Sequence, residues 1–249
     1  GRLEAGVATV DTTYHVGSSA GQYASTRDGG PGDFDPHVQQ GKNQASYGIQ
    51  SRLTARAIVV REAGGQKHAI LKTDLYIPQD LLWRRVAHLL EQGDSGIGRK
   101  NLTMSVSHNH SSPYYSSTAW GAWAFQDVFD IRFYETMARR FADAVEQADD
   151  QTVPVRVSAR TGTFDKLHRN SMGPSTADDG TPAGYPQSDS EHTFTVVRFD
   201  DVTAKKPKPL AVFLNYSGHP EFLEGNNLLS ADYLGPLERF VDRETGATT

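Results

Sequence analysis

His108 and His110, separated by one residue, are the side chains in this sequence whose type and spacing most directly suggest chemistry. They follow Leu102–Val106, where apolar and polar residues alternate as they do in a β-strand with one buried face. If the alternation continues, both imidazoles project from one face at the strand end, where Ser111–Pro113 begins a loop. Such a pair supplies two ligands in many zinc sites. Two half-buried histidines bonded to backbone carbonyls would give the same pattern, so both interpretations stay open.

A third histidine also stands at the end of an apolar segment. Leu210–Tyr216 is predicted to be a strand, and the residues Ser217-Gly-His-Pro-Glu221 follow it, so His219 marks a second strand end. Three protein ligands with one open position are the usual arrangement of catalytic zinc, which polarises a carbonyl and acidifies bound water. Glu221 and Asp232 follow His219 closely enough to orient a ligand or to serve as a base.

Asp74 is a further candidate because it closes a predicted strand. Arg52–Glu62 and Lys67–Asp74 flank Ala63-Gly-Gly-Gln66, which is a strong signal for a β-hairpin. A carboxylate at the end of such a strand can face a cleft and support a metal ligand through a hydrogen bond. The alternative is that Asp74 is a turn or capping residue.

Aromatic side chains gather just after the histidine pair. The segment Ser111–Phe125 contains Trp120 and Trp123 among small residues. They are suited to line an apolar substrate groove, or equally to form a small core of the loop itself.

The remaining periodicities predict an α/β fold. The order strand, helix, strand around the histidine pair, together with two hairpins, indicates a layered arrangement of mixed β-sheets, each containing a hairpin, covered by helices. In the last predicted helix, Tyr233, Leu237, Phe240 and Val241 are expected to face inward. No linker or repeat divides the chain, so we expect residues 1–249 to form one domain. The other predicted elements are strands over residues 3–10, 153–161, 192–199 and 210–216, and helices over residues 78–92, 127–148 and 233–244.

The composition limits the classes of function. The 249 residues carry a formal net charge of −5, without a basic stripe, which argues against a nucleic-acid partner. There is no cysteine, so any metal site must use His, Asp, Glu or Tyr. No apolar run approaches the roughly 20 residues of a membrane span, and no signal peptide is visible.

Five segments, taken in order, resemble the neutral ceramidases, the neutral/alkaline non-lysosomal family, and specifically their N-terminal catalytic domain. Ser107-His-Asn-His-Ser-Ser-Pro113 is similar to the family's His-Thr-His-Ser-Gly-Pro signature. The resemblance extends over essentially the whole chain. The other matching segments are Ala5–Asp11, Gly48–Ala57, Lys72–Leu75, and Asn215–Pro220 continued by Leu229–Asp232.

The resemblance implies a zinc amidase that cleaves the N-acyl bond of ceramide, a lipid-like amide, in a secreted or periplasmic protein. It leaves peripheral contact with a membrane open. It implies that His108 and His219 bind zinc and that His110 lies in the active site near the reacting group. A family arginine in an Asn-Arg-Ser context corresponds to Arg169, although the order here is His168-Arg-Asn-Ser171.

The family carries a Glu and a Tyr that complete the zinc site, a nucleophilic serine and a C-terminal β-sandwich later in the chain. We therefore expect this chain to be incomplete at its C-terminus. The favoured function is zinc-dependent hydrolysis of an amide in a lipid-like substrate. The alternatives are a non-catalytic lipid- or surface-binding module that keeps the fold, and a metal-dependent esterase or phosphoesterase. Phosphate chemistry usually requires more carboxylates and a second metal.

Overall fold

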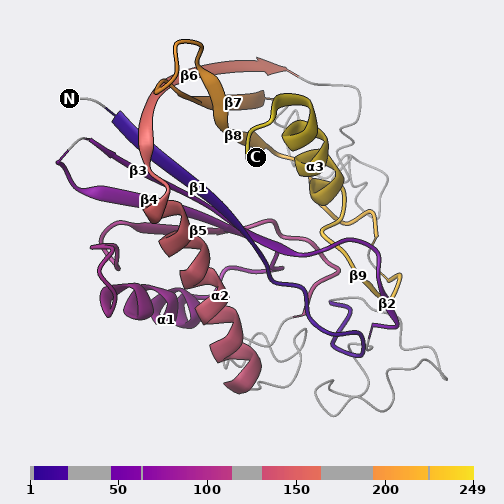
Figure 1. The fold of residues 1–249 in the computed structure, drawn as a ribbon. Coiled ribbons are helices and arrows are strands. Elements are labelled where there is room, and N and C mark those ends of the chain that lie inside the picture. Colours follow the sequence, from indigo (N-terminus) through magenta and orange to yellow (C-terminus); the bar gives the residue numbers. More distant parts are fainter. Residues whose placement is uncertain (1–2, 22–45, 63, 114–130, 164–192, 224) are drawn as a thin grey trace, which may run out of the picture.

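The computed structural model describes residues 3–21, 46–62, 64–113, 131–163, 193–223 and 225–249. Strands predominate among these residues, and helices cover them on two sides (Figure 1). In chain order the described elements are β1 (Leu3–Asp11), β2 (Gly48–Ile49), β3 (Thr54–Glu62), β4 (Lys67–Thr73), α1 (Asp80–Glu91), β5 (Leu102–Val106), α2 (Ile131–Asp150), β6 (Val153–Thr163), β7 (Thr193–Asp201), β8 (Lys208–Tyr216), β9 (Leu228–Leu229) and α3 (Leu234–Thr245).

One mixed sheet of seven strands, in the order β5-β4-β3-β1-β6-β7-β8, forms the centre of the fold. β3 and β4 form the first predicted hairpin, and β7 and β8 form the second. β4 and β5 run parallel because α1 carries the chain back between them. The predicted α/β class is confirmed. The expectation that the hairpins lie in separate sheets is wrong, because β1 pairs with β3 on one side and with β6 on the other.

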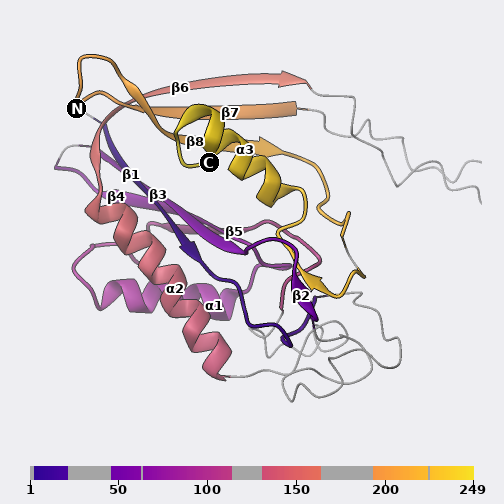
Figure 2. The same cartoon turned by 45° about the vertical axis from the view of Figure 1, so that its right-hand side comes forward.

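Helices α1 and α2 pack side by side against one face of this sheet (Figures 1 and 2). The alternation in β3 directs Ala55, Ala57 and Val59 toward the helices, and all three are buried. Between the helices, the Arg85 guanidinium contacts the Glu135 carboxylate through two hydrogen bonds of 2.9 and 2.8 Å. The core of this layer includes Leu71, Leu82, Val86, Leu90, Met137, Phe141 and Val145.

Helix α3 lies on the other side of the sheet, near β8 and the C-terminus (Figure 1). It contacts a charged part of the sheet, because Arg56 of β3 and Lys72 of β4 point toward it. The helix therefore turns Glu238 inward, where its carboxylate lies 3.0 Å from Arg56 Nε and 2.7 Å from Lys72 Nζ. The expectation that Phe240 faces inward is wrong: its side chain is 53% exposed.

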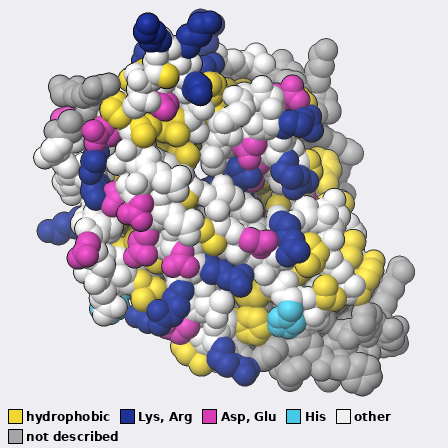
Figure 3. Space-filling model, viewed as in Figure 1, with side chains coloured by type: hydrophobic (Ala, Val, Ile, Leu, Met, Phe, Trp, Pro, Cys, Tyr) yellow, Lys and Arg dark blue, Asp and Glu magenta, His cyan; other side chains and the backbone are white. Residues whose placement is uncertain are grey.

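The surface mixes both signs of charge. On the face in Figure 3, the described Lys and Arg side chains alternate with Asp and Glu side chains and with apolar ones. None of the helices in the described ranges is both long and apolar enough to cross a membrane.

Gly6 permits the close approach of β1 to the end of α2, and this contact generates a stability prediction. A Cβ atom at residue 6 would lie 1.9 Å from the Ala148 carbonyl oxygen and 2.9 Å from the Thr152 nitrogen. Both atoms belong to the backbone, so the helix would have to shift. We expect Gly6→Ala to lower the free energy of unfolding by about 3 kcal/mol or more in urea denaturation.

Gly162→Ala is the matched control for this substitution. Gly162 also lies in a strand, β6, but nothing is within 4 Å of a Cβ atom placed there. Its substitution should change the free energy of unfolding by less than about 1 kcal/mol. Equal effects of the two substitutions would mean that the β1–α2 contact is not as close as described.

Candidate functional site

The histidine pair lies in a loop that begins where β5 ends. The strand stops at Val106, and the next two residues bind the end of β4 and the segment after it: the Ser107 N–H donates to the Thr73 carbonyl at 2.9 Å, and the His108 N–H donates to the Leu75 carbonyl at 3.0 Å. His108 has a φ of 60°, in the left-handed region. The strand alternation therefore does not continue to His110 as predicted, because the backbone turns at His108.

The turn around His110 is fixed by short-range hydrogen bonds and by a close neighbour. The Asn109 side chain accepts the Ser111 N–H at 3.1 Å and donates to the Ser107 hydroxyl at 3.0 Å. Gly21, with a φ of 97°, passes so close that a Cβ atom there would lie 2.4 Å from the His110 carbonyl oxygen. His110 itself is 3% exposed. The backbone around His110 is therefore closely packed, and the residue is almost inaccessible to solvent.

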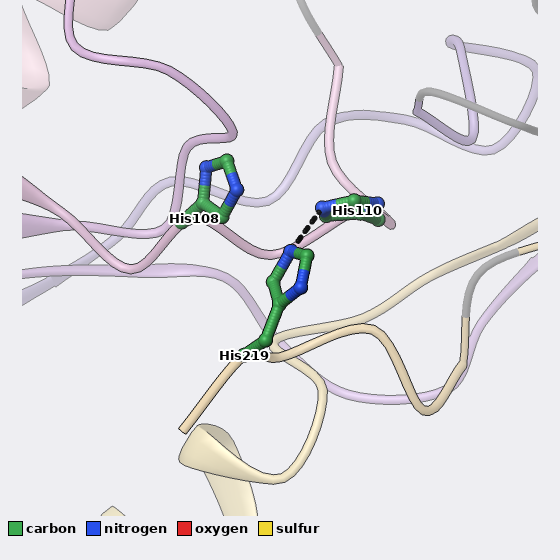
Figure 4. A group of neighbouring side chains, drawn as sticks. All are labelled: His108, His110 and His219. Atoms are coloured by element: carbon green, nitrogen blue, oxygen red, sulfur yellow. Dashed lines mark hydrogen bonds between the residues drawn. The ribbon is translucent and has the colours of Figure 1, made fainter. Parts of the chain in front are cut away.

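His219 reaches the same place from β8, and three imidazoles converge (Figure 4). One nitrogen from each of His108, His110 and His219 lies within 4.8 Å of the others. The closest pair is Nε2 of His110 and Nε2 of His219, which are 2.9 Å apart. The rings of His108 and His219 stack with centroids 5.0 Å apart, and the ring of His110 stands edge-on to both. The spatial convergence predicted for these three side chains is present.

The partners of the Nδ1 atoms define the tautomers. Nδ1 of His108 lies 2.7 Å from the Tyr76 carbonyl oxygen, and Nδ1 of His219 lies 3.2 Å from the Glu221 carboxylate. The Tyr76 carbonyl only accepts, so Nδ1 of His108 carries the proton, and a neutral ring then has its lone pair on Nε2. The nearby Glu221 carboxylate favours the same tautomer for His219. With this tautomer assigned to His219, His110 Nε2–H is the donor in the hydrogen bond between the two rings. Two imidazoles thus present lone pairs to the site, and the third presents a proton.

The donor set fits a zinc ion. Nitrogen ligands at about 2.0–2.1 Å in a tetrahedron lie about 3.4 Å from one another. One nitrogen from each imidazole lies within 4.8 Å of the others, so the three rings are near enough to surround one ion. A carbonyl or carboxylate beside Nδ1, as found for His108 and His219, is the usual support of a metal-binding imidazole. The chemistry of these residues is therefore compatible with a bound cation.

The three predicted acidic residues have different surroundings. Glu221 contacts His219 directly, as described above. Asp232 is buried and accepts the Leu223 N–H at 2.9 Å, so it binds the loop that carries His219 rather than its imidazole. Asp74 is also buried, but its carboxylate accepts from Lys72 Nζ at 2.5 Å and from the Thr54 N–H at 2.8 Å. The structure thus places Asp74 in the ion cluster under α3.

Tyr76 is a site residue that the sequence did not single out. Its ring stacks on His108 with centroids 4.8 Å apart and meets His110 edge-on at 4.7 Å. The available signal was topological: β4 and β5 are parallel neighbours, so the residues after both strands meet at one edge of the sheet. Arg169, Trp120 and Trp123, which were predicted to act in catalysis or to bind substrate, lie outside the described residues.

Comparisons with known proteins agree with the fold and with the resemblance. Residues 40–248 match a family model described as the N-terminal part of neutral/alkaline non-lysosomal ceramidase. The neutral ceramidase of Drosophila melanogaster is 24% identical over 212 residues, which cover 81% of this chain and 29% of that protein.

Two solved structures share the fold. A ceramidase complexed with C2 has a TM-score of 0.76 and 18% identity, covering 99% of this chain and 36% of that one. The neutral ceramidase from Pseudomonas aeruginosa has a TM-score of 0.72 and 18% identity, covering 99% of this chain and 37% of that one. The chain spans about a third of the length of these proteins. Because the family model matches most of the sequence, this chain belongs to the neutral/alkaline non-lysosomal ceramidase family, through the family's N-terminal domain.

Proposed function

We propose that this chain supplies the zinc-binding histidines of an amide hydrolase that cleaves the N-acyl bond of ceramide. The observation that carries the proposal is the group of three imidazoles, whose nitrogens converge within 4.8 Å at the ends of two strands. Family membership supports the reaction class. The names of the relatives support ceramide as the substrate. A secreted or periplasmic location is part of the proposal and rests on the family resemblance alone.

In this proposal, Nε2 of His108 and Nε2 of His219 hold the zinc, because both present lone pairs. The Tyr76 carbonyl and the Glu221 carboxylate contact Nδ1 of His108 and of His219, respectively, and so orient the two rings. A zinc ion bound there would polarise the acyl carbonyl and acidify a bound water. His110 has a different role. Its Nε2–H points at the same space from a buried ring, so it is placed to stabilise charge on the substrate or to pass a proton to the leaving amine.

The hydrocarbon part of the substrate has a candidate place beside the histidines. A cavity of about 310 Å³ lies between α3 and the sheet, and Ser107 and Gly218, neighbours of His108 and His219, border it. Much of its wall is apolar, as expected for a lipid-like ligand. Trp120 and Trp123 remain a predicted part of the groove wall, and Arg169 a predicted catalytic residue. The apolar lining includes Ile58, Ile70, Val106, Phe194, Leu214 and Leu237.

Metal analysis tests the assignment of ligands. The metal-free chain, given zinc and dialysed, should retain about one zinc per chain. His108→Ala and His219→Ala should each weaken zinc binding at least about tenfold, because each removes a lone pair. His110→Ala should retain most of the zinc, since its nitrogen donates a proton instead. His68→Ala, in an exposed position on β4, is the control. Full zinc retention by a His108→Ala/His219→Ala variant would contradict the assignment.

Release of fatty acid from an N-acylsphingosine tests the activity. The assay compares the 249-residue chain with any longer gene product that contains it, each with and without a chelator. We expect little release by the 249 residues alone, because they span about a third of the relatives' length. The longer product should show chelator-sensitive release. There, His110→Ala should lower kcat by about 10²- to 10⁴-fold while zinc content is unchanged.

The outcome of this assay separates the proposed function from its alternatives. If no product shows chelator-sensitive cleavage of ceramide or of a simpler N-acyl amide, the non-catalytic lipid-binding module becomes the better interpretation. Cleavage of carboxylic or phosphate esters without amide cleavage would instead identify a metal-dependent esterase.

A further inference from the structure

The short loop that carries His219 is held at both of its ends by the beginning of α3. Before the histidine, the Gly218 carbonyl accepts the Tyr233 hydroxyl proton at 2.7 Å. After it, the Leu223 N–H donates to the Asp232 carboxylate at 2.9 Å. The His219 side chain is 46% exposed, so burial alone does not fix it. The two hydrogen bonds act together with the Ser111 hydroxyl, which donates to the Leu223 carbonyl at 3.1 Å, and with the Phe222 ring, which lies edge-on to Tyr233.

The residues that make these two bonds are themselves rigidly placed. Asp232 is 1% exposed, and its backbone has a φ of 51°, in the left-handed region. The Asp232 N–H donates to the Ser230 hydroxyl at 2.9 Å, and the Ala231 N–H donates to the Ser51 hydroxyl at 2.9 Å. A second oxygen of Asp232 accepts the Tyr233 N–H at 2.7 Å. The start of α3 is thus a fixed platform for the His219 loop.

The contact between Gly218 and Tyr233 leaves no room for a side chain. A Cβ atom at residue 218 would lie 2.7 Å from the Tyr233 hydroxyl and 3.0 Å from the Tyr216 ring. Burial raises the pKa of Tyr233 to about 12, with contributions from Tyr216 and Asp232, so the hydroxyl keeps the proton that it donates. The close fit indicates that this hydrogen bond is a defined part of the structure of the loop.

We propose that Tyr233 and Asp232 form a clamp that positions His219 for metal binding. Tyr233 holds the backbone before the histidine, and Asp232 holds the backbone after it, so the Nε2 lone pair stays directed at His108 and His110. Both are positioning residues, since neither contacts the imidazole nitrogens through the bonds described. The clamp rests on the proposed function, because it acts through the zinc ligand His219.

Tyr233→Phe is the direct test, since it removes one hydroxyl and keeps the ring. Zinc affinity of the 249-residue chain, measured by competition with a chromophoric chelator, should fall about tenfold, as for other partners of metal ligands. In the metal-free chain, backbone hydrogen exchange over residues 217–223 should be faster than in the wild type. Asp232→Asn should have a similar effect on both measurements, with the larger increase at Leu223.

Tyr134→Phe is a matched control for the general loss of a buried hydrogen bond. The Tyr134 hydroxyl also donates to a backbone carbonyl, that of Leu81 at 2.9 Å, but it joins α2 to α1. We expect this variant to lose thermal stability comparable to that of Tyr233→Phe while its zinc affinity and the exchange of residues 217–223 stay at wild-type values.

Gly218→Ala provides a second, independent variant. The added methyl group should displace the Tyr233 hydroxyl and weaken zinc binding at least as much as Tyr233→Phe does. In the double variant Gly218→Ala/Tyr233→Phe the collision with the hydroxyl is absent. Because only the contact with Tyr216 then remains, its affinity should lie closer to that of Tyr233→Phe alone than to the sum of the two losses.

The results distinguish failure of the clamp from failure of the zinc site. If the wild type binds zinc and Tyr233→Phe binds it equally well with unchanged exchange, the clamp is overturned and the zinc site stands. If the wild type binds no zinc, the proposed zinc site is overturned together with the role of the clamp in metal binding. In that case, backbone hydrogen exchange over residues 217–223 still shows whether Tyr233 and Asp232 hold the loop.

Discussion

The contact between His110 and His219 is the constraint on which the rest of the structure depends. These residues are 109 positions apart and follow β5 and β8, which are the two edge strands of the seven-stranded sheet. In a flat sheet the edges would be far apart, since neighbouring strands lie about 4.8 Å from each other. The sheet must therefore twist and coil strongly enough for its edges to approach. Both strands border the same cavity under α3, which is the space enclosed by that curvature.

The local elements of the fold could be predicted from sequence because their signals are local. Ala63–Gln66 defined one hairpin, and the recurring apolar residues defined the helices. The approach of β5 to β8 could not be predicted from sequence, because it depends on the accumulated twist of all seven strands. In the site, the three histidines were identified by their positions at strand ends. The Nδ1 partner of His108 was missed, since the Tyr76 backbone carbonyl carries no sequence signal.

Charge, more than apolar packing, determines how α3 sits on the sheet. Burial raises the pKa of Glu238, and Asp74 adds to this effect, whereas Lys72 and Arg56 act in the opposite direction. Burial would lower the pKa of Lys72, but the carboxylates of Asp74 and Glu238 outweigh it, so the amine stays charged. Buried ion pairs add little net stability compared with apolar contacts, yet they tolerate few alternative arrangements. The apolar periodicity of α3 predicted that Phe240 faces inward. Such a periodicity identifies apolar faces only, so it could not show that the face carrying Glu238 is the buried one.

The placement of the histidines on opposite edge strands has a consequence for the order of events during folding. His108 and His110 follow β5, whereas His219 exists in its final position only after β6, β7 and β8 have been added to the sheet. A nascent or partly folded chain therefore offers only one of the two proposed zinc ligands, His108, and a cation would bind it weakly. Because binding free energy at such a site is also folding free energy, an ion held by both His108 and His219 would favour the completed sheet over every partly assembled form. A bound ion would thus indicate that β8 has joined the sheet.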